Sequence, residues 1–190
     1  MKRLFIAIDY LPSERFPQQY AELKKCSCKL DRINWVHPEL MHLTIKFLGE
    51  TSEDRIPLLV SLLTDVATKI PSFQLKLNRI GAFGSRYQPR VIWLGPEELP
   101  ARLGDLQREM ETVLRKHGFP PTYGRFVAHL TLARIHSIDS KNYFWDGIEK
   151  AAGLFNETFQ VRQFILYESV LQKGKAPQYI ALQCFPLKEA

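Results

Sequence analysis

The segment HLTIKF at residues 42–47 decides how this sequence is interpreted. Apolar and polar residues alternate along it with a period of two, which is typical of a strand with one buried face. Residues two apart in a strand point to the same side, so His42 and Thr44 share one face while Leu43 and Ile45 share the other. The segment therefore predicts a strand that presents an imidazole and a hydroxyl to the same surface.

The same pattern returns in the second half of the chain, as HLTL at residues 129–132. His129 follows His42 by 87 positions (129 − 42 = 87), and RVIWLG at 90–95 resembles RLFIAI at 3–8 at the same offset (90 − 3 = 87). The segments FQL at 73–75 and FQV at 159–161 match at an offset of 86 (159 − 73 = 86). A repeated order of motifs at one offset is the sign of an internal duplication.

Strands and helices alternate in each half. We expect a buried strand at 3–9 and a helix at 13–25, whose apolar residues recur at helical spacing. The spacing Thr51-x-x-Asp54 resembles a capping box that opens a second helix, which Pro71 ends. Further strands are expected at 73–80 and 90–95, and a helix with apolar positions from Leu99 to Leu114 that ends at Gly118.

These patterns predict an α+β, bilobal, duplicated fold in which two antiparallel sheets face a central cleft and the helices lie outside. Residues 1–190 are expected to form a single bilobal domain whose second copy starts near residue 90. Neither half has a linker-like boundary, and each is small for a stable core of its own. The duplication would bring the two histidine strands together across a pseudo-twofold axis.

Composition narrows the class of protein. The 190 residues are 45% apolar, which allows a sizeable core, and 26 basic against 20 acidic residues give a net charge of +6. A modest basic excess suits a polyanionic partner but is also common in ordinary soluble proteins. Three cysteines are too few for a disulfide framework, and no apolar run approaches the roughly 20 residues of a membrane span. We expect a cytoplasmic protein without contact to membranes.

Two histidines that meet in one cleft suit the cleavage of a phosphodiester by acid and base. One imidazole takes a proton from the nucleophile and the other protonates the leaving oxygen, while the two threonine hydroxyls donate to the phosphate oxygens. A single His-x-Thr strand would be unremarkable as surface or core, and the repetition is what favours catalysis. Two histidines supply too few ligands for a catalytic zinc site, so we expect no metal and no cofactor.

The sequence resembles the two-histidine phosphoesterase superfamily over essentially its whole length, and within it the bacterial RNA 2′,3′-cyclic phosphodiesterases, also called 2′-5′ RNA ligases. The resemblance is carried by RLFIAIDY, HLTIKFLGE, PRVIWLG, HLTLAR and ESVLQKGKAPQYIAL. It implies that His42 is the proton donor and His129 the proton acceptor, with Thr44 and Thr131 binding phosphate. Members often carry proline before the second histidine, where this chain has Ala128.

The resemblance also implies the reaction. It is the hydrolysis of RNA 2′,3′-cyclic phosphate ends to 2′-phosphomonoesters without a metal, with 2′-5′ RNA ligation as the reverse. The partner is then an RNA end with a cyclic phosphate, tRNA fragments being one candidate source, and the protein is expected to be a monomer. Alternatives with the same site are a cyclic nucleotide, a 2′-5′ oligonucleotide or ADP-ribose cyclic phosphate as substrate. A non-catalytic RNA-binding module is the alternative from another class.

Four further side chains are candidate substrate contacts. Strict alternation places Lys46 on the face of His42, where it would reach a phosphate, although it equally fits an edge lysine that prevents aggregation. The same rule turns Arg134 away from the cleft unless the strand bends, but the motif HLTLAR keeps it a candidate. Phe47 and Phe126 suit the stacking of a base, with core packing as the alternative.

Overall fold

The computed structural model describes residues 1–172, 174 and 176–189. Within these residues, four helices and ten strands follow one another in an α+β arrangement, so the expected fold class is confirmed. Two residues of the late ESVLQKGKAPQYIAL segment, Lys173 and Lys175, lie outside the described part. The elements are β1 (Lys2–Asp9), α1 (Phe16–Lys24), β2 (Arg32–Trp35), β3 (His42–Thr51), α2 (Ile56–Lys69), β4 (Phe73–Leu77), β5 (Arg79–Gly84), β6 (Pro89–Gly95), α3 (Ala101–Lys116), β7 (Leu130–Ser137), α4 (Lys141–Ala152), β8 (Glu157–Val161), β9 (Gln163–Val170) and β10 (Gln178–Pro186).

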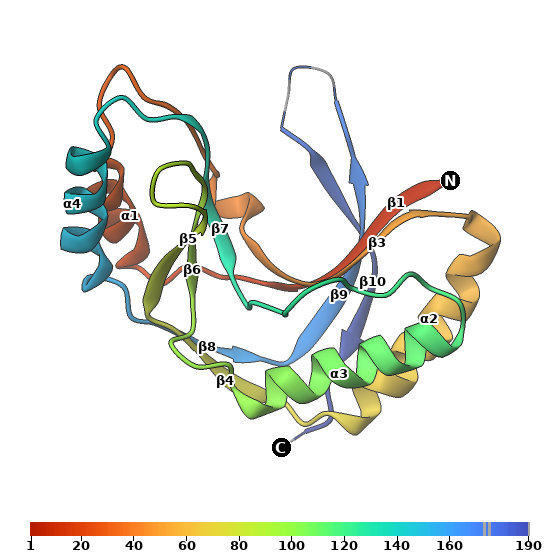
Figure 1. The fold of residues 1–190 in the computed structure, drawn as a ribbon. Coiled ribbons are helices and arrows are strands. Elements are labelled where there is room, and N and C mark those ends of the chain that lie inside the picture. The colour runs from red at the N-terminus through yellow and green to blue at the C-terminus, as the bar shows by residue number, and fades with distance from the viewer. Residues whose placement is uncertain (173, 175, 190) are drawn as a thin grey trace.

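Antiparallel pairing organises the described strands into sheets of eight and of two. The order of the larger sheet is β10-β9-β1-β3-β7-β6-β5, with β2 also paired to β7 (Figure 1). The two motif strands β3 and β7 are neighbours at its centre, where Leu43 pairs with Leu130. They therefore meet edge to edge, and strands from both halves of the chain form one continuous sheet.

The matched segments of the two halves pair with each other. Besides Leu43 with Leu130, Gln74 of β4 pairs with Gln160 of β8 in the two-stranded sheet. In both cases a residue faces its own counterpart at the offset seen in the sequence. A twofold pseudo-axis between the partners accounts for both contacts, and it relates β3 to β7.

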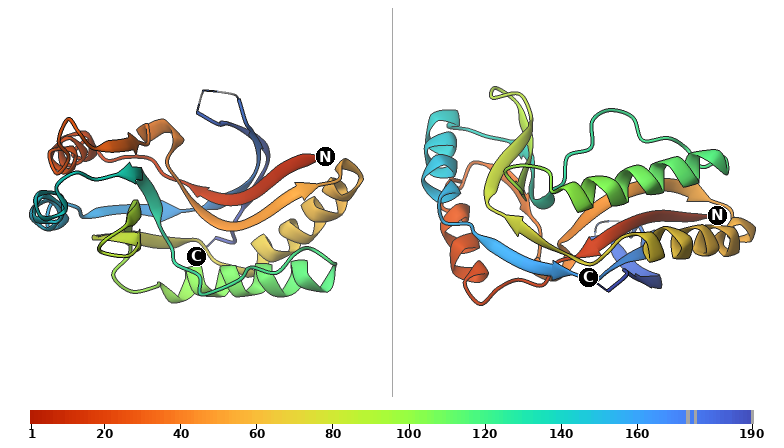
Figure 2. Two further views of the ribbon diagram at one scale, coloured as in Figure 1. Left: turned by 45° about the horizontal axis from the view of Figure 1, so that its top comes forward. Right: turned by 90° about the horizontal axis from the view of Figure 1, so that it is seen from below.

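The outer strands are exchanged between the two halves of the chain. The strand β9 of the second half lies on β1 of the first, and β5 of the first half lies on β6 of the second at the opposite side of the sheet. The helices also pair across the halves, α1 with α4 and α2 with α3, at opposite ends of the molecule (Figure 2). None of the helices within the described chain is long and apolar enough to cross a bilayer.

One helix start differs from the sequence prediction. Thr51 belongs to the end of β3 and its hydroxyl donates to the carbonyl of Gly49, so it does not cap a helix. The helix α2 begins only at Ile56, after a short 3-10 turn over Glu53–Arg55. The capping-box interpretation was therefore wrong, because the strand persists five residues beyond Lys46 and occupies the position proposed for the cap. The stretch 73–80 also divides into β4 and the start of β5.

Candidate active site

A β-bulge in β3 decides which side chains join the histidine face. Ala7 of β1 pairs with Thr44 and the next residue, Ile6, pairs with Lys46, so Ile45 is an extra residue without a partner. Directly paired residues share a face, and Ile6 and Ala7 point to opposite faces of β1. Ile45 and Lys46 are consequently both buried on the core side. The bulge resets the alternation after the His-x-Thr motif.

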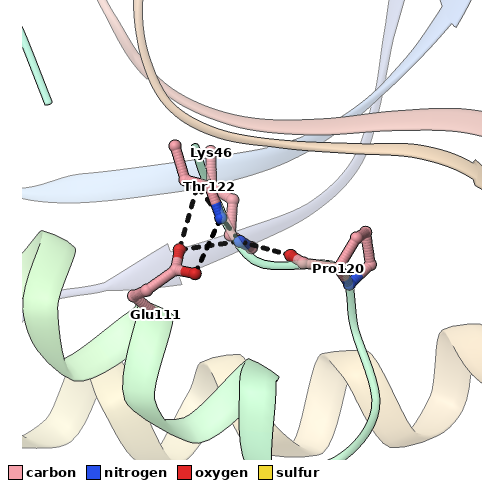
Figure 3. Close-up of polar contacts among 4 residues, drawn as sticks. All are labelled: Lys46, Glu111, Pro120 and Thr122. Atoms are coloured by element: carbon pink, nitrogen blue, oxygen red, sulfur yellow. Dashed lines mark hydrogen bonds and ion pairs between the residues drawn. The ribbon is translucent and has the colours of Figure 1, made fainter. Parts of the chain in front are cut away.

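Lys46 is therefore not a substrate contact, contrary to the prediction from strict alternation. Lys46 is only 3% exposed. Its ammonium donates to the Glu111 carboxylate at 2.7 Å, the Pro120 carbonyl at 2.8 Å and the Thr122 hydroxyl at 3.2 Å (Figure 3). Glu111 also accepts from the Thr122 backbone N–H at 2.8 Å. Lys46 ties the loop that precedes His129 to β3 and α3.

Glu111 shows the electrostatic effect of this contact. Burial raises the pKa of the Glu111 carboxyl, but the hydrogen bonds from Lys46 and Thr122 outweigh it and hold this pKa below its usual value. The carboxylate is therefore ionised near neutral pH and paired with a buried cation. Such a pair is costly to break from one side only.

The same bulge brings Phe47 onto the histidine face. Phe47 pairs with Phe5, which lies on the side of β1 that carries Ala7. Its ring centroid is 6.0 Å from that of Phe5 and the residue is 65% exposed. The core-packing alternative for Phe47 is excluded by this exposure, and the ring is free to stack on a planar group.

A second bulge occupies the equivalent position in β7. Trp93 of β6 pairs with Thr131 and the adjacent Ile92 pairs with Ala133, so Leu132 is the extra residue. The two bulged residues are separated by the offset of the duplication (132 − 45 = 87). Arg134 then pairs with Val91 and lies exposed on the face of Thr131. The bulge therefore turns Arg134 toward the face of the candidate site, whereas strict alternation predicts the opposite face.

His42 stands at the start of β3 with its Nδ1 2.9 Å from the Leu40 carbonyl. A carbonyl oxygen only accepts, so Nδ1–H donates to it and Nε2 remains for proton exchange. The half-buried ring packs among aromatic residues, 5.0 Å from the Phe5 centroid and 4.9 Å from Tyr179 in an edge-on contact. This packing fixes the orientation of the imidazole.

His129 has an equivalent environment just before β7. Its Nδ1 lies 2.8 Å from the Val127 carbonyl, so Nε2 is again the free nitrogen. The rings of Phe83 and Trp93 flank it at 4.9 and 6.4 Å between centroids. Trp93 lies flat over Gly81, where a Cβ would come within 2.1 Å of the indole, so only glycine fits at that position.

The pKa values of both histidines are lowered from 6.5, chiefly because burial disfavours the imidazolium. The backbone carbonyls oppose this shift, and the positive charge of Arg134 adds to it at both rings. His129 also lowers the pKa of His42 by charge repulsion, which reflects how close the two rings are. Their proton affinities are thus coupled, as expected for groups that serve one site.

Asp9 is a candidate site residue that the sequence analysis did not single out. It pairs with His42 across β1 and β3, and its charge raises the pKa of His42. The Tyr167 hydroxyl donates to the Asp9 carboxylate and so fixes it. The sequence places Asp9 at the end of the strand predicted from RLFIAID, and this strand lies beside the His42 motif. Only the register of the two strands shows that Asp9 is the cross-strand partner of His42.

Of the remaining candidates, the two threonines lie at the site and Phe126 lies in the core. Extending the antiparallel register by one residue on each side of Leu43 and Leu130 sets Thr44 beside His129 and Thr131 beside His42. Phe126 is half-buried and packs against the core, in line with the alternative left open for it, and we do not assign it to substrate. Within the described residues, no three His, Cys, Asp or Glu side chains gather as a metal site.

A duplicated α+β fold whose two His-x-Thr motifs meet on neighbouring strands defines the class of two-histidine phosphoesterases. Comparison with known proteins gives the family. The model of the LigT like Phosphoesterase family matches residues 11–93 and again residues 94–176, and the chain belongs to this family.

The chain is similar to several proteins of known name. The "RNA 2′,3′-cyclic phosphodiesterase" of Methanocaldococcus jannaschii is 33% identical over 169 residues, which cover 89% of this chain and 92% of that protein. The protein of the same name from Thermotoga maritima is 33% identical over 170 residues, covering 89% and 87%. The crystal structure of E. coli LigT complexed with 3′-AMP superimposes with a TM-score of 0.73, at 26% identity over 99% of both chains.

Proposed function

We propose that the protein hydrolyses 2′,3′-cyclic phosphate ends of RNA to 2′-phosphomonoesters, acting as one bilobal unit and without a metal ion. The observation that carries the proposal is the pairing of Leu43 with Leu130, which sets two His-x-Thr motifs side by side about a pseudo-twofold axis. The names of the relatives agree with this substrate. Ligation of 2′-5′ RNA ends is the reverse of the same reaction.

In the proposed mechanism each imidazole exchanges a proton through its free Nε2. His129 takes a proton from water, which attacks phosphorus, while His42 protonates the oxygen that leaves. The hydroxyls of Thr44 and Thr131 donate to the non-bridging oxygens and stabilise the charge that develops there. In an in-line displacement the attacking and leaving oxygens lie on opposite sides of phosphorus, which suits two histidines related by a twofold axis.

The surroundings of the two rings support His42 as the acid. Arg134 favours the neutral form of both rings, but the charge of Asp9 acts on His42 alone and favours its protonated form, as a general acid requires. The twofold symmetry of the motifs is thereby broken by charge. Arg134 and the exposed Phe47 are proposed to contact the substrate, as a phosphate ligand and a base-stacking ring.

The proposal predicts the product of a defined substrate. Purified protein in excess EDTA is expected to open a synthetic RNA that ends in 2′,3′-cyclic phosphate and to leave a 2′-phosphate, because the 3′ oxygen is expelled. Phosphorus NMR against synthetic 2′- and 3′-phosphate standards identifies the isomer. Loss of activity in EDTA that zinc or manganese restores would contradict the metal-free mechanism. A 3′-phosphate product would mean that the ribose binds in the opposite orientation.

The pH dependence of kcat/KM is expected to be bell-shaped, with its maximum on the acid side of pH 6.5, since both histidine pKa values are lowered from that value. The acid limb reports His129 losing its proton and the alkaline limb reports His42 losing its own. Asp9→Asn removes the charge that raises the pKa of His42, so the alkaline limb should move to lower pH more than the acid limb moves. Initial rates over pH 4.5 to 9 measure both limbs, and an unmoved alkaline limb would exclude Asp9 from this role.

A further inference from the structure

A hollow of about 350 Å³ lies at the far end of β7, beyond the candidate active site. We call it the β7-end hollow. The turn between β5 and β6, the last residues of β7 and the start of α4 enclose it. The residues that line it include Tyr87, Arg90, His136 and Lys141.

Its lining has the character of a nucleic-acid site. Arg90 and Lys141 are exposed cations, His136 is an exposed imidazole, and no carboxylate is among the described residues that line it. Tyr87 stands at the tip of the turn and is 78% exposed. A tyrosine that packs against its own protein buries far more of its surface, so this ring is free to contact a ligand. A cationic hollow with a free aromatic ring at its rim matches the way proteins hold single-stranded nucleic acid.

The hollow lies at the rim of the sheet, where the face that carries the candidate site ends: His136 belongs to that face, whereas Arg90 precedes Val91 and belongs to the opposite face of β6. Beyond the bulge, Arg134 and His136 are two residues apart and both exposed, so they continue the face of β7 that carries Thr131. His136 is five residues beyond Thr131, which is about 17 Å of strand. A stacked single strand advances roughly 3.4 Å per nucleotide, so a chain leaving the site reaches the hollow after about five nucleotides.

We propose that the β7-end hollow binds the single-stranded RNA upstream of the terminal cyclic phosphate, with Arg90 and Lys141 on backbone phosphates and Tyr87 stacked on a base. The inference rests on the proposed function, since it extends the binding of the same RNA substrate. The hollow contributes affinity for long substrates and takes no part in the chemistry. Substitutions in the hollow should accordingly raise KM and leave kcat unchanged.

Two unstructured substrates with 2′,3′-cyclic phosphate ends test the proposal, a dinucleotide that stops short of the hollow and a decanucleotide that passes it. The variants are Tyr87→Ala and the double variant Arg90→Gln/Lys141→Gln. Arg102→Gln/Lys150→Gln is the matched control, because it removes the same charge from exposed positions on α3 and α4. Rates are measured over a range of salt concentrations.

Both hollow variants should raise KM for the decanucleotide about tenfold at unchanged kcat, and leave the dinucleotide unaffected. The slope of log(kcat/KM) against log[salt] should become less steep by about 1.4 for the Arg90/Lys141 variant, since two phosphate contacts are lost. Equal losses on both substrates, an unchanged decanucleotide KM, or the same losses in the control variant would overturn the proposal. An effect seen only with a hairpin substrate would assign the hollow to double-stranded RNA instead. Hydrolysis of the dinucleotide by the unaltered protein tests the proposed function separately.

Discussion

Replacing His42 or His129 by alanine should lower kcat by about 10²- to 10⁴-fold, since each variant loses one of the two proton-transfer groups. Each ring meets the rest of the protein through aromatic edges and one bond to a backbone carbonyl, so the fold should persist. Single-turnover hydrolysis of an RNA with a cyclic phosphate end measures the loss, and circular dichroism confirms folding. Substrate binding should survive in both variants.

The matched control is His37→Ala, since His37 is an exposed imidazole outside both motifs. The His37→Ala variant should retain full activity. Because the two candidate histidines act on one transition state, the double variant should lose less than the product of the two single losses. A single variant that kept near-full hydrolysis would refute the paired acid and base, and full function in both would favour a non-catalytic RNA-binding module.

Replacing Lys46 by methionine should destabilise the protein by about 3 kcal/mol, because it leaves the Glu111 carboxylate without its buried cation. For a chain of this length that corresponds to a fall in Tm of roughly 6 to 12 °C. The activity should fall as well, since the Pro120 and Thr122 contacts that hold the loop before His129 are lost. Differential scanning calorimetry and kcat measure the two effects.

The exposed ion pair between Lys69 and Glu109 supplies the control, because Glu109 is on the same helix as Glu111. Lys69→Met should change Tm little, as is usual for pairs in solvent. The double variant Lys46→Met/Glu111→Met should recover part of the lost stability, since no charge is then left buried alone. Equal behaviour of the Lys46 and Lys69 variants would show that the buried network does not stabilise the loop.

Local pattern and the internal offset together predicted much of this molecule. The period of two in HLTIKF and the recurrence of His-Leu-Thr at 129–131 indicated paired strands, and the structure joins them at Leu43 and Leu130. The helix ending at Gly118 is also present, with this glycine in the left-handed conformation that stops helices. These features could be predicted because the burial of one strand face and the end of a helix depend on residues that are close together in the sequence.

The faces of Lys46, Phe47 and Arg134 could not be predicted in this way. A single extra residue, Ile45 in one strand and Leu132 in the other, reverses the faces of the side chains that follow it directly, and neither residue type by itself predicts a bulge. The role of Asp9 depends likewise on a cross-strand partner that is fixed by register. Pairing between distant strands is a tertiary property, so the sequence pattern carries the motif but not its neighbours.

The exchange of β5 and β9 between the halves has a consequence for synthesis of the chain on the ribosome. The strand β1 ends at Asp9 and its partner β9 begins at Gln163, so one side of β1 stays without its native pairing while the chain grows by the 154 residues needed to reach β9 (163 − 9 = 154). Such long sequence separation slows folding, because the loop-closure entropy must be overcome before the contacts form. An exposed apolar strand of this kind is a binding site for chaperones and a point where nascent chains aggregate.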